Sequence, residues 1–364
     1  MKDRKGRNRM MFDFIGIELT RRCNVNCAHC MKGEPQNLDI ENETIDNFLD
    51  QAHIIGKLSF LGGEPTLALD KMRYILEGLK KREILLFKLE CTTNGLIKSP
   101  EFVQIIKDYG EYIRWSWVRD DLDLNYHVKI QISADDYHQA AGCDYEDSYI
   151  YYKVNLYNWA DVSRLTTGKF PVKKGRAVNL PEAFDPAGFN FLRNDRRVEM
   201  LTKDVRPACP NYQAYKLPYE DCIYIVCDLA LSAKGDLMFF HFSDHEYEFE
   251  DANIICNVNG NIYEQILEFN KGRIPCISYL KREQQEKAAL NAELEKRNAK
   301  NPNLRKALIE FYSENGFAKM DRDPSDEYYY DGQNTIIGDL KGLDEAEKAY
   351  KTHDYGVDWN GFKQ

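Results

Sequence analysis

The chain has 364 residues, of which 43% are hydrophobic, enough for a substantial core in one large domain with an appendage or in two to three domains. The formal net charge of -10 and a pI near 5.4 argue against nucleic acid as a partner. No apolar run approaches the roughly 20 residues of a membrane helix, and the basic start lacks a cleavage site, so we expect a cytoplasmic protein without a membrane partner.

The first half of the chain alternates strand-like and helix-like segments. Residues 1–10 form a basic arm, and the first strand spans Phe12 to Leu19. The segments that follow are a helix from Ile45 to Ile55 ended by Gly56, a strand Leu58 to Leu61, a helix Met72 to Leu79, a strand Ile84 to Glu90, a helix from Phe102 closed by Gly110, an irregular insertion over 112–127, and a strand Val128 to Ile132. This order predicts βαβ units, a parallel sheet and ligands at the carboxyl ends of the strands.

A loop with three cysteines follows the first strand, at Cys23, Cys27 and Cys30. A structural zinc site is usually closed by four protein ligands, whereas a cubane cluster held by three cysteines leaves one iron open to a small molecule. Two other interpretations stay open: a zinc knuckle that uses His29, and three reduced thiols. In a long chain without a signal peptide, the ten cysteines are better explained as thiols or metal ligands than as disulfides.

Three later strands also end in polar or glycine-rich loops. These are Gly62-Gly63-Glu64-Pro65, Thr92-Thr93-Asn94-Gly95 and Ser133-Ala134-Asp135. Each loop alone is an ordinary turn, but together they indicate a ligand site. Glycines without a Cβ allow a ligand close to the backbone, and Glu64 offers an acceptor to a positively charged amino group.

The spacing CxxxCxxC, followed in order by GGEP, resembles the radical S-adenosylmethionine (SAM) superfamily. The resemblance implies an α/β fold, a partial (β/α)6 TIM-like barrel over 11–205. It implies that Cys23, Cys27 and Cys30 hold a [4Fe-4S] cluster and that Gly62, Gly63, Glu64 and Pro65 hold the SAM amine. It also places Ser133 and Asp135 at the SAM ribose and Asn94 in the same pocket. Arg176, in a GRA-type segment, would contact the SAM carboxylate or form a surface ion pair.

The resemblance extends more loosely to residues 206–278. A pair of cysteines, a hairpin around Ala233-Lys234-Gly235, a GNI-like strand in the segment Ile254 to Tyr263 and an apolar helix resemble a degenerate SPASM or twitch extension. The cysteine expected after the hairpin is replaced near Phe240 and His241. We therefore expect either buried reduced thiols or one auxiliary cluster or metal, using some of Cys209, Cys222, Cys227, Cys256 and Cys276. Residues 279–364 are expected to form a charged, mainly helical appendage.

The activity implied is reductive cleavage of SAM, with an electron from a donor such as flavodoxin or ferredoxin. The product is a 5′-deoxyadenosyl radical that removes hydrogen from a substrate, for which the SPASM-like segment favours a peptide or protein. The alternatives are RNA or a small molecule as substrate, or a non-enzymatic iron-sulfur or zinc module. No residue stands out as the catalytic acid or base.

Overall fold

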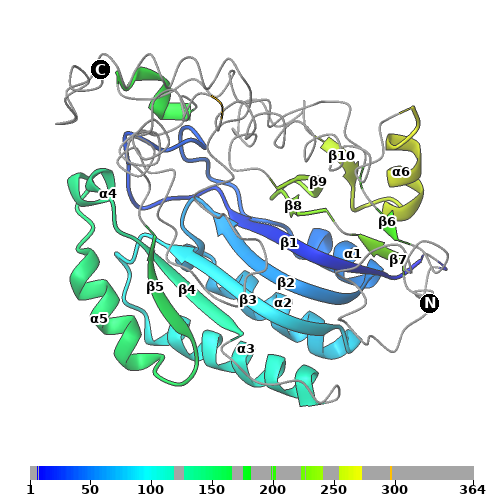
Figure 1. Cartoon of the computed structure of the whole chain (residues 1–364), viewed down its shortest axis with the longest axis horizontal. Helices are drawn as coiled ribbons and strands as arrows, with labels where there is room; N and C mark the ends of the chain where they lie inside the picture. Colours follow the sequence, from blue (N-terminus) through cyan, green and yellow to red (C-terminus); the bar gives the residue numbers. More distant parts are fainter. Residues whose placement is uncertain are drawn as a thin grey trace.

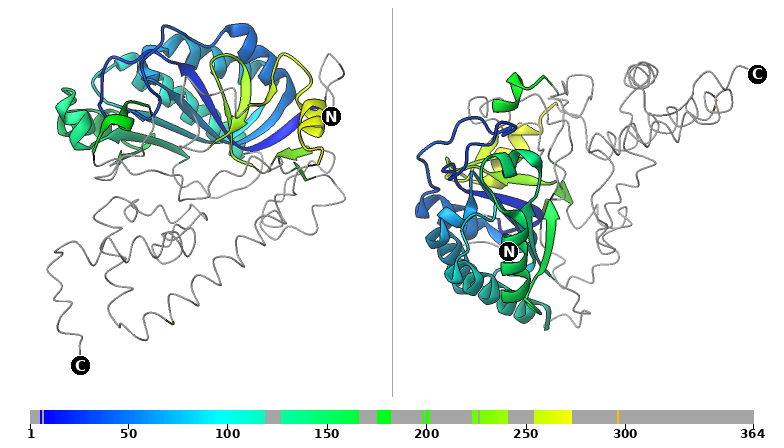
Figure 2. Two further views of the ribbon diagram at one scale, coloured as in Figure 1. Left: turned by 90° about the horizontal axis from the view of Figure 1, so that it is seen from above. Right: turned by 90° about the vertical axis from the view of Figure 1, so that its left-hand side faces the viewer.

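The computed structural model describes residues 6, 8–118, 127–165, 175–181, 198, 200–201, 223–225, 227–240, 254–272 and 296. Within them the chain forms one curved sheet with helices packed on its convex face (Figures 1 and 2). The elements in order are β1 (Met10–Thr20), α1 (Asn42–Gln51), β2 (Ala52–Gly62), η1 (Pro65–Leu67), α2 (Leu69–Arg82), β3 (Leu85–Thr93), α3 (Pro100–Val118), β4 (Val128–Ser133), α4 (Asp136–Ala140), α5 (Tyr145–Asn155), β5 (Asp161–Leu165), η2 (Gly175–Asn179), β6 (Met200–Leu201), β7 (Ile223–Ile225), β8 (Leu229–Leu231), β9 (Asp236–Phe239), β10 (Ile254–Asn257) and α6 (Ile262–Phe269).

The sheet is open rather than closed into a complete barrel. Its strand order is β10-β9-β8-β1-β2-β3-β4-β5, and β1 to β5 pair in parallel with their neighbours. The predicted α/β fold with a partial barrel is therefore confirmed. The sixth unit of the predicted (β/α)6 arrangement falls on residues that lie mostly outside the described ranges. No helix in the described part of the chain is long and apolar enough to span a bilayer.

Helix α3 is longer than its sequence pattern suggested. Its buried positions recur every three to four residues, from Phe102 and Ile106 through Tyr109 to Ile113 and Ser116, so one apolar face continues past Gly110. The expectations that the helix ends at Gly110 and that an irregular insertion begins at 112 were wrong. Tyr112 fixes the second half, because its hydroxyl donates to the carbonyls of Leu79 (3.1 Å) and Ile84 (2.7 Å).

Helix α1 is shorter than predicted. It ends at Gln51, and β2 starts directly at Ala52, so the residues up to Ile55 belong to a strand. All of Ala52, His53, Ile54 and Ile55 are buried. A short apolar run of this kind fits a buried parallel strand as well as a helix, which explains the error.

The predicted hairpin is present as β8 and β9, and it joins the same sheet as the barrel strands. The two strands pair antiparallel, and Gly235 in their turn has a φ of +90°, a conformation that favours glycine. Strand β8 also pairs in parallel with β1, while β10 and α6 follow in the expected order. The boundaries at 206, 278 and 279 remain predictions, and residues 279–364, apart from 296, lie outside the described ranges.

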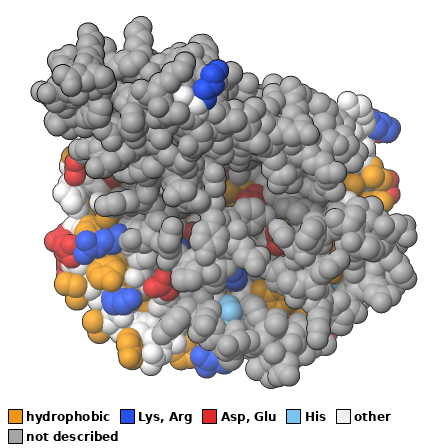
Figure 3. Space-filling model, in the orientation of Figure 1, with side chains coloured by type: hydrophobic (Ala, Val, Ile, Leu, Met, Phe, Trp, Pro, Cys, Tyr) orange, Lys and Arg blue, Asp and Glu red, His pale blue; other side chains and the backbone are white. Residues whose placement is uncertain are grey.

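The concave face of the sheet is polar. Register places Lys57 beside Lys88 and Ser59 beside Glu90, and Glu90 lies in turn beside Lys129. The alternate residues, such as Phe60, face the helices. In the middle of Figure 3, acidic, basic and histidine side chains of the described residues are visible. A closed barrel fills this space with branched apolar residues, so the polar face indicates a hollow for a ligand rather than a packed core.

One carboxyl group on β1 makes stability depend on pH. Burial, with the nearby Asp228 carboxyl, raises the pKa of Asp13 to about 6, against the attraction of Lys57 and Lys88. Between about pH 4 and 6 the folded chain keeps a proton on Asp13 that the unfolded chain loses, so this group's contribution to stability falls as pH rises through that window.

We expect Asp13→Asn to raise the free energy of unfolding at pH 7.5 by up to about 3 kcal/mol. Urea unfolding should show this gain fading towards about pH 3, which lies below the ordinary pKa of 3.8, because Asp13 is then protonated in both states. An equal gain at both pH values would contradict the assignment.

Candidate functional site

The carboxyl ends of β1 and β2 are joined through backbone hydrogen bonds. The loop after β1, residues 21–30, is called the cysteine loop below. The Gly63 amide donates to the Thr20 carbonyl (2.9 Å), and the Glu64 amide donates to the Arg22 carbonyl (2.8 Å). A Cβ on Gly63 would lie 2.3 Å from the Arg22 carbonyl oxygen. Only glycine allows the two backbones to approach this closely.

Glu64 is a buried carboxylate that connects the ends of β2 and β3. Its Oε1 accepts from the Thr66 amide (3.1 Å), the Thr66 hydroxyl (2.6 Å) and the Thr93 hydroxyl (2.7 Å). Its Oε2 accepts from the Asn94 amide (2.8 Å), and the Asn94 side chain donates to Asn24 Oδ1 (2.8 Å) in the cysteine loop. Four donors hold this carboxylate, and through Asn94 it links the loops that follow β1, β2 and β3.

The start of the cysteine loop is held by a buried ion pair. Arg21 Nε donates to Glu18 Oε2 at 2.9 Å, and both side chains are almost completely buried. The same Glu18 oxygen accepts from the Ala233 amide (3.0 Å) in the β8–β9 turn. Arg21 also donates to Gln36 Oε1 (3.1 Å). The hairpin and the cysteine loop are thus attached to each other through β1.

The end of the cysteine loop is held by η2, far along the chain. The Arg176 amide donates to the Cys30 carbonyl (2.9 Å), and its Nε donates to the Cys27 carbonyl (2.9 Å). Its Nη1 is buried without a hydrogen bond and lies 3.5 Å from Glu34 Oε2. Gly175 has a φ of +53°, and a Cβ there would lie 2.5 Å from the Cys30 carbonyl oxygen. These two residues hold the loop closed over the thiols.

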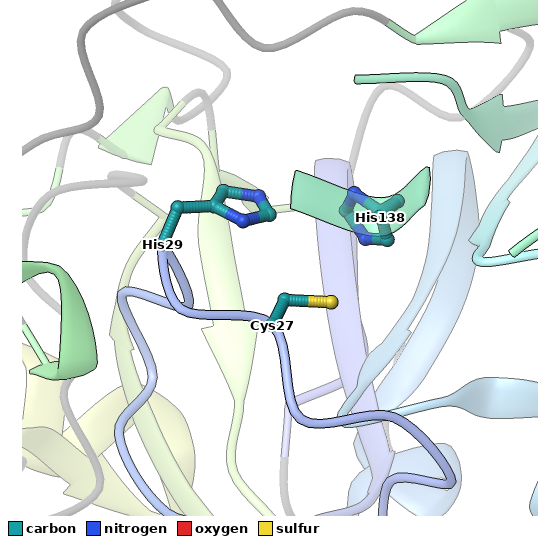
Figure 4. A group of neighbouring side chains, drawn as sticks. All are labelled: Cys27, His29 and His138. Carbon is teal, nitrogen blue, oxygen red and sulfur yellow. The ribbon is translucent and has the colours of Figure 1, made fainter. Parts of the chain in front are cut away.

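Two histidines approach Cys27 from different elements (Figure 4). His29 lies in the cysteine loop, and His138 lies on α4, whose N-cap is Asp135. Both Asp135 oxygens lie at 2.8–2.9 Å from His138 Nδ1, and Oδ2 lies 3.6 Å from His29 Nε2. His29 also stacks on Tyr137 with a centroid distance of 4.7 Å. One ligand atom each from Cys27, His29 and His138 lies within 4.8 Å of the others.

Burial sets the protonation of this group. It raises the pKa of Cys23 to about 11 and the pKa of Cys143, which packs beside Cys23 and Cys27, to about 11. It lowers the pKa of His29 to about 4. For His138 burial also lowers the pKa, but the hydrogen bonds to the Asp135 carboxylate and to Cys27 outweigh it and raise the pKa to about 9. Cys23 is therefore a thiol at neutral pH, and a bound metal would displace its proton.

A comparison with protein families gives a match over the part of the chain that carries this site. Residues 17–146 match the model of the Radical SAM superfamily, which here runs from β1 into α5. Residues 17–146 form a radical SAM domain.

Curated relatives of the radical SAM domain differ in what their names describe. GTP 3',8-cyclase of Clostridium acetobutylicum is 34% identical over 116 residues, which are 30% of this chain and 35% of the relative. AdoMet-dependent heme synthase of Methanosarcina barkeri is 31% identical over 101 residues, 26% of this chain and 28% of the relative. Molybdenum cofactor biosynthesis protein moc-5 of Caenorhabditis elegans is 31% identical over 104 residues, which are 27% of this chain and 17% of the relative. The chain spans about a third or less of these relatives.

Among solved structures, native anSMEcpe with bound AdoMet and Cp18Cys peptide is 14% identical with a TM-score of 0.41, over 73% of this chain and 82% of the other. Streptococcus suis SuiB bound to precursor peptide SuiA is 12% identical with a TM-score of 0.31, over 63% of this chain and 59% of the other. At these scores the sequence match over 17–146 remains the basis of the assignment.

The donor set of the radical SAM domain suits the cluster and SAM that its family implies. Cys23, Cys27 and Cys30 lie on one short loop as free thiols, and Cys27 is buried. The GGEP segment is hydrogen-bonded to the same loop, with Pro65 opening η1. Three soft sulfur ligands beside a glycine-lined strand end are what a cubane cluster and a small ligand require.

Several polar residues predicted to contact SAM have protein partners of their own. Asp135 faces His138 and His29, Arg176 binds loop carbonyls, and Asn94 binds Asn24. Ser133 is buried at the end of β4. Their contacts with SAM stay predictions.

The cysteines considered for an auxiliary site are only partly described. Cys256 is buried on β10 and Cys227 is partly buried before β8, and the metal-ligand group found in the described residues contains neither. Cys209, Cys222 and Cys276, with His241, lie outside the described ranges.

Sequence reasoning missed four residues of this site: Asn24, His138, Cys143 and Gly175. His138 alone left a local signal, because an N-cap Asp135 places the residue three positions later on the same side of a helix start. Cys143 and Gly175 reach the cysteine loop only through the tertiary fold.

Proposed function

We propose that this chain is a radical SAM enzyme in which Cys23, Cys27 and Cys30 hold a [4Fe-4S] cluster and Gly62 to Pro65 hold the SAM amine. The observation that carries the proposal is the pair of backbone hydrogen bonds that Gly63 donates to Thr20, the last residue of β1, and Glu64 donates to Arg22 in the cysteine loop. These bonds bring the thiols and the glycine-rich strand end into one rigid unit, as a ligand that bridges them needs.

When bound, the cluster supplies one electron to cleave SAM to methionine and a 5′-deoxyadenosyl radical. The residues of this chain would position the ligands and exclude water. Glu64, fixed by four donors, would keep the GGEP carbonyls in place, and Arg176 with Gly175 would close the cysteine loop. The electron would come from a small donor such as flavodoxin or ferredoxin, in the cytoplasm.

For the substrate we favour a peptide or protein. The support is the order of the β8–β9 hairpin, β10 and the apolar helix α6, which is the order expected of a SPASM-like extension. A nucleotide or another small molecule is the second candidate, because a relative over part of this domain is named GTP 3',8-cyclase. The polar concave face with Lys57, Lys88 and Lys129 suits a charged small ligand.

The proposal is tested by the products of SAM cleavage. Chain reconstituted anaerobically with iron and sulfide, then reduced, should release 5′-deoxyadenosine and methionine from SAM in equal amounts. Chain exposed to air before the assay should release neither. Adding the true substrate should accelerate 5′-deoxyadenosine formation, so peptide mixtures and nucleoside triphosphates are compared in parallel. A reconstituted chain that holds iron but never cleaves SAM would reject the enzyme and leave an iron-sulfur module.

A further inference from the structure

Cys27, His29 and His138 have the composition and proximity of a mononuclear metal site. A thiol and two imidazoles are a ligand set that zinc uses, and their ligand atoms lie within 4.8 Å of one another. In Figure 4 the Cys27 sulfur points into the space below the two rings. Ligand atoms around a tetrahedral zinc ion lie about 3.5 Å apart, because zinc binds at about 2.0–2.3 Å, so modest side-chain movement would close the site.

Asp135 lies close to both imidazoles, on the side of each ring that faces away from the proposed metal position. Its carboxylate contacts His138 at Nδ1 (2.8 Å), which leaves Nε2 of that ring for another partner. Its Oδ2 also lies 3.6 Å from His29 Nε2. A carboxylate bound to the far nitrogen of a ligating histidine fixes the ring and increases its basicity, a common support in zinc sites.

An unsatisfied atom is found at the same place. His29 Nδ1 is buried and has no hydrogen-bond partner, and its side chain is only 10% exposed. A buried polar atom without a partner is costly and calls for an explanation. Because Asp135 lies on the Nε2 side of the ring, Nδ1 is the nitrogen left to bind a ligand.

We propose that the cluster-free chain binds one zinc-class divalent cation through Cys27, His29 and His138, with Asp135 orienting both rings. The Cys27 thiol proton leaves to the buffer on binding, and a water completes the four positions. Because Cys27 is also a proposed cluster ligand, this site and the cubane exclude each other. The inference goes beyond the proposed function and concerns the chain before its cluster is built.

The test uses the full chain, freed of iron with a chelator under anaerobic conditions and titrated with Co²⁺. We expect one Co²⁺ per chain, a thiolate-to-cobalt charge-transfer band, intense visible bands of a tetrahedral ion and displacement by Zn²⁺. His29→Phe keeps a ring against Tyr137 but removes the ligand, and His138→Gln removes the other. Each should weaken Co²⁺ binding by at least about tenfold, and Asp135→Asn by about 10–100-fold.

The matched control is the double variant Cys23→Ala, Cys30→Ala, which cannot build a cubane but keeps all three proposed ligands. Its Co²⁺ affinity should equal that of the natural chain. If the double variant loses Co²⁺ while both histidine variants keep it, the metal sits on three thiolates and the inference is wrong. Failure of the natural chain to bind Co²⁺ would equally reject it.

A second readout does not depend on spectral assignment. Preloading with Zn²⁺ should slow the uptake of iron and sulfide by the natural chain, and His29→Phe should relieve that block. Far-UV circular dichroism establishes that each variant is folded, and if His138→Gln does not fold, His29→Phe carries the test. Equal inhibition in the natural chain and His29→Phe would contradict the proposed ligands. Loss of SAM cleavage alone would count against the proposed function and leave this site intact.

Discussion

The triple variant Cys23→Ala, Cys27→Ala, Cys30→Ala should contain no cluster in the radical SAM domain and produce no 5′-deoxyadenosine. The natural chain should hold about four irons after reconstitution if it has one cubane site. Three thiols on one loop, closed by Arg176 on the Cys27 and Cys30 carbonyls, supply its protein ligands. Without them too few thiolates remain to bind iron. Iron and sulfide analysis, the visible spectrum and product assay measure the loss.

The control changes a cysteine that is buried elsewhere. Cys91→Ala should cost about 1 kcal/mol in stability and keep the iron content, since its side chain is buried in β3. If the triple variant keeps about four irons while the natural chain holds about eight, a second cubane site is filled. In that case Cys227, Cys256 and the cysteines outside the described ranges would be its candidates. Unchanged SAM cleavage in the triple variant would overturn the proposed cluster site.

Gly63→Ala should disrupt the site through the backbone alone. The new Cβ would meet the Arg22 carbonyl oxygen at 2.3 Å and the Arg21 carbonyl oxygen at 3.0 Å, and neither can move without displacing the cysteine loop. The hydrogen bonds that the Gly63 and Glu64 amides donate to the Thr20 and Arg22 carbonyls would weaken together. We expect a loss of roughly 2–4 kcal/mol in the free energy of unfolding, with poor retention of iron and SAM. Urea unfolding, iron analysis and calorimetry with SAM measure these effects.

Gly110→Ala is the matched control. It makes the same chemical change in the interior of α3, where the nearest atom to the new Cβ is Trp159 at an ordinary 3.4 Å. Alanine is the better helix former by about 1 kcal/mol, so this variant should be as stable as the natural chain or more stable. Similar unfolding midpoints for the two variants would show that the close backbone approach at Gly63 does not matter.

The sequence predicts the parts of this fold that depend on local pattern. The alternation of apolar strands with helical periodicity identifies β1 to β4 and their helices, and the Ala233-Lys234-Gly235 turn identifies the hairpin. The errors occur where a local signal competes with packing. Gly110 resembles a helix end, but the buried face of α3 continues on both sides of it. Ala52 to Ile55 suit a helix and a buried strand equally.

The candidate site divides in the same way. Cys23, Cys27, Cys30 and the GGEP segment are recognised because each motif is contiguous. The roles of individual side chains cannot be recognised in this way, because they depend on partners that are distant in the chain. Glu64 is held by Thr93 and Asn94, and Asp135 is turned towards His29. Arg176 reaches a carbonyl 149 positions earlier, a contact that no local pattern encodes.

That last contact also sets an order of events during protein synthesis. The thiols leave the ribosome before Arg176, which lies 149 positions after Cys27 and supplies the hydrogen bonds that hold their loop. At about 5–20 residues per second, roughly 7–30 seconds of translation separate the two. During this interval the nascent chain presents its cysteines on an unfinished loop, and a metal ion in the cell can reach them before Arg176 is available to hold that loop.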